Sequence, residues 1–198
     1  MSTPLTPPEL AKLEQQFAKS DEQQQTSQVI EQGERLSAYF FAQKQLPRAL
    51  DFASKVRQTA GEATPPSIFN RMGVISAAQG EHKQAVELFT RALAGYRQQG
   101  NRERCLSTSH NLGATALKIK DFETYFEYEM QAYKLALKLK KKRMVFMLGY
   151  SLGGFLLTTG KQKDGAVQML KNSYRIGLAS GYPETGKLEM FMREQGLL

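Results

Sequence analysis

The sequence has 198 residues, of which 41% are hydrophobic and 23% charged, with a net charge of +8. It holds no apolar run near the roughly 18 residues that a membrane span requires, and its first residues lack the basic and apolar regions of a secretory signal. The single cysteine, Cys105, excludes an internal disulfide. We therefore expect a folded cytoplasmic protein; the charge permits an acidic partner but does not require one.

The N-terminal segment, residues 1–26, is expected to cap the rest of the chain. Residues 7–19 begin with proline and have an amphipathic pattern, which predicts an opening helix. Residues 20–27 are polar and predict a mobile connector.

Residues 27–180 have the pattern of four helix–turn–helix units, and no segment has the period of a strand. Gly, Pro and Asn clusters separate the units. The predicted helix pairs are 27–43 with 46–60, 66–79 with 82–98, 102–119 with 122–140, and 143–159 with 162–180.

Small residues recur through these units at a fixed interval. Gly73, Gly113 and Gly153 lie forty residues apart, each after a bulky residue, and Ala92 and Ala132 keep the same spacing. Repetition at one period is the mark of a repeat architecture. Residues 181–198 follow the array. The segment 184–194 is predicted to form a closing helix that covers the apolar end face of the last unit.

These residues resemble the tetratricopeptide repeat. Its unit has small residues where paired helices touch and large ones where they interlock, as in Gly73, Ala85, Phe89 and Ala92 of the second unit. The resemblance implies an all-α fold, a right-handed superhelix of about four helical hairpins with capping helices at both ends. The forty-residue period is similar to that of the long-repeat subclass in bacterial peptide-sensing regulators and eukaryotic cell-polarity adaptors.

The third unit departs from the family pattern in its second helix. Tyr125 stands where a small residue is expected, and Glu129 stands where an aromatic residue is expected. Two explanations are open: the helix is rotated, or Tyr128 takes the aromatic role.

The resemblance also implies a function, namely a protein-interaction scaffold or adaptor without catalytic activity or cofactor. In such arrays the first helices of the hairpins line a groove that holds a peptide or a helix. Asn is a suitable contact because its amide can both donate to and accept from a peptide backbone. The alternative is that these polar groups bond neighbouring helices or water. The predicted partner-binding positions are Asn70, Arg71, Val74, His110, Asn111, Leu117, Lys118, Tyr150 and Leu157.

The densest charge run provides a second hypothesis, binding to nucleic acid or another acidic surface. A purely structural role of this run is favoured, because cations stabilise the C-terminal end of a helix. Neither a second basic cluster nor a pattern of stacking aromatic residues supports binding to nucleic acid. The candidate anion contacts are Lys138, Lys140, Lys141, Lys142 and Arg143.

A third hypothesis is self-assembly through the apolar C-terminal tail, which contains Phe191, Met192, Leu197 and Leu198. No motif favours an enzyme or a metal site. The two histidines and one cysteine lack zinc-ligand spacing, and no serine has a base oriented toward it.

Overall fold

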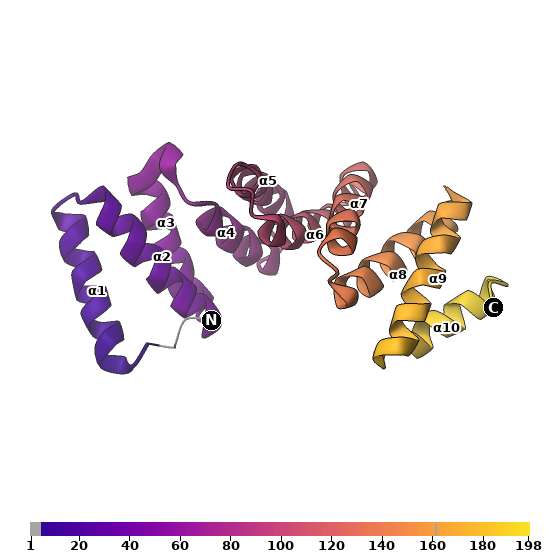
Figure 1. Cartoon of the computed structure of the whole chain (residues 1–198). Helices are drawn as coiled ribbons and strands as arrows, with labels where there is room; N and C mark the ends of the chain where they lie inside the picture. Colours follow the sequence, from indigo (N-terminus) through magenta and orange to yellow (C-terminus); the bar gives the residue numbers. More distant parts are fainter. Residues whose placement is uncertain (1–4, 161) are drawn as a thin grey trace. The chain divides into compact units, whose positions relative to one another are not determined.

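The computed structural model describes residues 5–160 and 162–198, and over these ranges it contains α-helices, one short 3₁₀ helix and no strand (Figure 1). The all-α fold is confirmed. In chain order the helices are α1 (Pro7–Glu22), α2 (Thr26–Ala42), α3 (Leu46–Ala60), η1 (Gly61–Ala63), α4 (Pro66–Ala78), α5 (His82–Gln98), α6 (Arg102–Lys118), α7 (Phe122–Lys138), α8 (Lys142–Thr158), α9 (Lys163–Ser180) and α10 (Thr185–Glu194).

The chain divides into two compact units, Met1–Asn101 and Arg102–Leu198. In the first unit α2 pairs with α3 and α4 with α5, while α1 packs against α2 and α3 against α4. In the second unit α6 pairs with α7 and α8 with α9, while α7 packs against α8 and α10 against α9. The four predicted hairpins are therefore present, with helix ends within two residues of the predicted ones.

The connector between the first two helices is shorter than predicted. Helix α1 continues to Glu22 and α2 begins at Thr26, so only residues 23–25 lie between them. Ser20 is buried, and its hydroxyl donates a hydrogen bond to Oε1 of Gln28, 3.0 Å away. The prediction of a mobile segment over 20–27 was wrong in extent, because a polar sequence can still form helix when it packs on a neighbour. Residues 1–4 of the predicted cap lie outside the described residues.

The glycines spaced forty residues apart are the contact points inside successive hairpins. A Cβ atom added to Gly73 would lie 2.8 Å from the ring of Phe89, and one added to Gly153 would lie 2.9 Å from Leu170. Distances this short are repulsive between carbon atoms, so each first helix approaches its partner at a position where a side chain does not fit. The repeat read from the sequence is thus a repeat of packing contacts.

The third hairpin keeps this geometry with a different side chain. A Cβ atom on Gly113 would lie 2.9 Å from Cγ of Glu129, so Glu129 has the position that Phe89 has in the second hairpin. Glu129 is only 2% exposed, whereas Tyr128 is half-buried. Helix α7 is therefore not rotated, and Tyr128 does not replace the aromatic residue. Both explanations from the sequence were wrong, because a carboxylate can occupy a buried position when a partner satisfies it.

The turns within the hairpins share one backbone conformation, with a residue in the left-handed region. In the second hairpin this residue is Gly80, with φ 85°, and the next N–H, that of Glu81, bonds back to the carbonyl of Ser76. In the third hairpin it is Lys120, with φ 59°. A side chain in this region costs about 1–2 kcal/mol, so the third turn is formed at some expense in stability.

Candidate interaction surfaces

The second helix of each hairpin covers one face of the first and leaves the other face uncovered. On α6 the positions left exposed or half-buried follow the helical period of three and four residues. These positions are Ser107, His110, Asn111, Ala114, Leu117 and Lys118. We call this uncovered face of a first helix the inner face.

In the first unit, the inner face of α4 contains Asn70, Arg71 and Val74, all half-buried. Arg71 Nη1 lies 3.5 Å from the backbone carbonyl of Glu34 on α2, and the Glu34 carboxylate accepts a hydrogen bond from Ser67. Asn70 and Arg71 make further interactions within the chain. Arg71 thus contacts a neighbouring helix of the same unit.

In the second unit, His110 is tied to the buried carboxylate of the third hairpin. Its Nδ1 lies 2.9 Å from Oε1 of Glu129, and the hydrogen bond to Glu129 raises the pKa of His110 although burial opposes this. The other carboxylate oxygen, Oε2, is buried and has no hydrogen-bond partner. His110 therefore bonds a neighbouring helix, and only about a third of its side chain is exposed for a partner.

The inner face of α8 adjoins the closing helix. The rings of Tyr150 and Phe191 lie 6.2 Å apart between centroids, and Tyr150 and Leu157 pack with Phe191 against the same buried cluster. From the sequence, Phe191 was expected in the closing helix and in an apolar tail, but not among the partner-binding positions. It belongs to the surroundings of the predicted site because α10 folds back after Gly181, a turn whose direction no local pattern reveals.

Comparison with known proteins identifies the repeat. Residues 64–138, from the start of α4 to the end of α7, match the family model described as tetratricopeptide repeat. This segment is a pair of tetratricopeptide repeats. A search of curated proteins finds no significant match.

Solved structures extend the tetratricopeptide-like fold over most of the chain. BtubC (BKLC) from P. vanneervenii has a TM-score of 0.59 at 17% identity, with 84% of this chain and 71% of that one covered. A putative kinesin light chain with TPR-like repeats from Podosopora anserina has a TM-score of 0.60 at 15% identity, covering 87% and 97%. The quorum sensor NprR from B. thuringiensis, in its apo form, has a TM-score of 0.59 at 13% identity, covering 91% and 58%. At these identities the likeness establishes the fold.

The basic run over residues 138–143, which begins at the end of the matched segment, divides into two sets. Arg143 Nη1 donates to Glu184 at 2.8 Å, and its guanidinium also lies 4.7 Å from the ring centroid of Tyr182. This pairing lowers the pKa of Glu184 to about 2. Lys141 forms an ion pair with Glu103. Arg143 and Lys141 therefore have structural partners, while Lys138, Lys140 and Lys142 are exposed and form no ion pair with a described residue.

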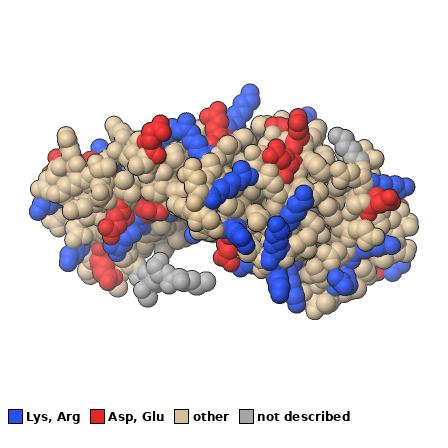
Figure 2. Space-filling view, turned by 45° about the horizontal axis from the view of Figure 1, so that its top comes forward, with Lys and Arg blue, Asp and Glu red and all other residues tan. Residues whose placement is uncertain are grey.

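Charge is distributed unevenly between the two units. The second unit has 16 Lys and Arg against nine Asp and Glu, whereas the first has 11 against ten. On the face shown in Figure 2, several basic side chains lie near one another just right of the middle of the view, and acidic side chains lie mainly above them. The second unit thus carries most of the net positive charge of the chain.

Most of the apolar C-terminal tail is buried or half-buried against the rest of the second unit. Met192 is fully buried, Phe191 and Leu197 are half-buried, and only Leu198 is half exposed, at 51%. The tail thus closes the second unit, as a capping helix of a repeat array does.

Within 5–160 and 162–198 no three His, Cys, Asp or Glu side chains are grouped so that they could hold a metal ion. None of the helices in the described part combines the length and the apolar character that crossing a bilayer demands.

Proposed function

We propose that the protein is an interaction scaffold that binds a peptide or helix segment on the inner faces of its first helices. The matched repeats and the fold support a protein-interaction scaffold in general terms, because the tetratricopeptide repeat is built from packing residues and exposes helix faces to partners. The binding mode, the peptide and the location in the cytoplasm are our inferences.

The observation that carries the proposal is the chemistry of the uncovered face of α6. Asn111 and Lys118 present a carboxamide and an ammonium group beside the exposed aliphatic side chain of Leu117. An amide can pair with the backbone of any extended peptide, while Leu117 offers apolar contact. An uncovered helix face with both kinds of group suits a segment bound through its backbone and one or two apolar side chains.

A double substitution tests this proposal. Asn111→Ala with Tyr150→Ala removes the amide and the aromatic ring of the two inner faces of the second unit. We expect this variant to lose a partner that the wild-type protein retains in a pull-down from cell extract. The matched control is Lys134→Ala with Gln168→Ala, which truncates two exposed side chains on the second helices of the same hairpins. Circular dichroism checks that both variants stay folded.

Two results would contradict the proposal. Undiminished recovery of the partner by the inner-face variant would exclude these faces, and equal loss in the control variant would place the contact on the opposite side of the hairpins.

A second candidate function is binding to an anionic surface through the second unit, favoured by its excess of basic residues and by the three exposed lysines without an acidic partner. Substitution of Lys138, Lys140 and Lys142 by glutamine should then abolish salt-sensitive retention on RNA or on anionic vesicles. Retention that is insensitive to this change would exclude the candidate.

A further inference from the structure

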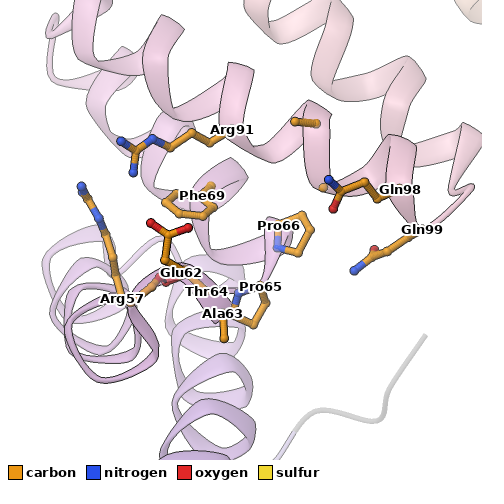
Figure 3. A pocket seen from close by; sticks show the side chains of 13 residues that line it. Arg57, Glu62, Ala63, Thr64, Pro65, Pro66, Phe69, Arg91, Gln98 and Gln99 are labelled. Atoms are coloured by element: carbon orange, nitrogen blue, oxygen red, sulfur yellow. Dashed lines mark hydrogen bonds between the residues drawn. The ribbon is translucent and has the colours of Figure 1, made fainter.

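The first unit contains a pocket that does not involve the inner faces. It has a volume of about 810 Å³ and lies among the end of α3, the loop that follows it, the start of α4 and the C-terminal half of α5 (Figure 3). Its lining includes Arg57, Glu62, Pro66, Phe69, Arg91 and Gln98. None of these is among the inner-face positions predicted from the sequence.

The walls of the pocket are held by specific local contacts. A Cβ atom on Gly95 would lie 2.4 Å from Cγ of Pro66, so the start of α4 contacts α5 at a position without a side chain. In the loop, the buried Thr64 donates its hydroxyl to the carbonyl of Gly61 at 2.6 Å. The loop and both helices are therefore packed against each other, and the pocket is a feature of the folded unit.

The guanidinium groups of two arginines lie near the same aromatic ring in this pocket. The guanidinium carbons of Arg57 and Arg91 lie 6.0 Å and 5.7 Å from the ring centroid of Phe69. The other basic side chains of α3, Arg48 and Lys55, both form ion pairs with acidic residues. No described carboxylate forms an ion pair with Arg57 or Arg91, so two guanidinium groups lie near a half-buried ring without an ion-pair partner.

Acidic residues are close by but do not pair with these arginines. Glu87 precedes Arg91 by one helical turn, a spacing at which ion pairs often form, yet the structure shows none. Glu62 is the one acidic residue among those that line the pocket, and Figure 3 shows its carboxylate pointing toward Phe69. The Glu62 carboxylate thus lies in the space beside the ring, and the pocket remains open around it.

The remaining polar groups of the pocket belong to glutamines. Gln98 and Gln99 line its other end, at the end of α5 and just after it. A side-chain carboxamide can donate to and accept from a peptide backbone. Guanidinium groups suit carboxylates, and an aromatic ring with a neighbouring proline suits an apolar side chain.

We propose that this pocket binds a short acidic peptide segment. One or two of its carboxylates pair with Arg57 and Arg91, an apolar side chain packs on Phe69, and the backbone bonds to the glutamines. The Glu62 carboxylate points toward Phe69, into the space that the acidic group takes up, so it competes with the ligand. This surface is a second binding site, separate from the inner faces.

Fluorescence polarisation with a labelled peptide of alternating glutamate and leucine tests the proposal. We expect binding that weakens as salt is raised, and no binding by the counterpart with glutamine in place of glutamate. Arg57→Glu and Arg91→Glu should each weaken binding about fivefold, as expected for partly exposed charge pairs, and the double variant more than about tenfold. Lys83→Glu, the same charge change near the opposite end of α5, is the matched control and should have little effect.

Glu62→Gln provides a test that loss of folding cannot imitate, because it should strengthen binding of the acidic peptide about twofold. Asn111→Ala with Tyr150→Ala should leave binding of this peptide unchanged, which separates the pocket from the proposed function of the inner faces. Equal weakening by Lys83→Glu and Arg91→Glu would overturn the proposal. So would binding of a single-stranded RNA oligonucleotide in preference to the peptide, because the arginines would then serve a nucleic acid.

Discussion

The second and third hairpins form the same contact between their two helices with different side chains, one apolar and one charged. In α4–α5 the glycine of the first helix faces the ring of Phe89, which is 1% exposed. In α6–α7 the corresponding glycine faces Glu129, equally buried but bonded to His110. The contact therefore requires a small residue on one helix and a side chain of suitable size on the other, and a charged group is accepted when a partner stands beside it. The two hairpins should consequently respond differently to substitution.

The largest expected effect is in the apolar hairpin. Phe89→Ala removes a buried ring and leaves a cavity opposite Gly73, so the free energy of unfolding should fall by about 3–5 kcal/mol. Urea denaturation followed by circular dichroism measures this. Glu87→Ala, an exposed change on the same helix, should alter the free energy by less than about 0.5 kcal/mol. If Phe89→Ala were equally mild, the ring would not be the contact that holds this hairpin.

The polar hairpin should be sensitive to the loss of one partner and tolerant of the loss of both. His110→Ala leaves a buried carboxylate without a bonded partner, which should cost about 1–3 kcal/mol. Adding Glu129→Leu, the residue type found at the same position of the fourth hairpin in Leu170, should restore most of this loss, because the buried charge is then absent. The same denaturation assay applies. A double variant less stable than His110→Ala would show that Glu129 is stabilising in itself.

The pair should also make stability depend on pH. The bond to Glu129 raises the pKa of His110 above its unfolded value of about 6.5, so folding favours the protonated histidine. Its contribution is complete below the unfolded pKa and is lost as pH rises through the folded pKa. The wild-type protein should therefore lose stability over this window relative to Glu129→Gln, in denaturation curves measured at successive pH values. Parallel profiles for the two proteins would contradict the assignment.

The smallest effect concerns the turns. Lys120→Gly should stabilise the protein by about 0.5–1 kcal/mol, because glycine takes the left-handed conformation that lysine takes at a cost, although it also adds freedom to the unfolded chain. Gly80→Ala at the matching turn of the second hairpin should act in the opposite direction. Melting temperatures of the two variants give the comparison, and shifts of the same sign would show that the left-handed φ does not govern these turns.

Three further features of the tertiary structure could not be predicted from the sequence. The pocket of the first unit depends on Arg57, Phe69 and Arg91, which lie on three different helices and share no motif. Helix α10 places Phe191 next to Tyr150, although the residues between them give no direction for the turn. Arg143 was predicted from the sequence as a candidate anion contact, but in the structure its guanidinium is paired with Glu184.

The hairpins, their turns and the close contacts at Gly73, Gly113 and Gly153 could be predicted from the sequence alone, because helical period and steric limits act between residues near in the chain or repeated at a fixed interval. Which polar groups are paired and which remain available was decided only by the tertiary structure. The hydrogen-bond partner of a side chain, such as Glu129 for His110, depends on the distance between two helices. That distance cannot be derived from the residues near either side chain in the sequence.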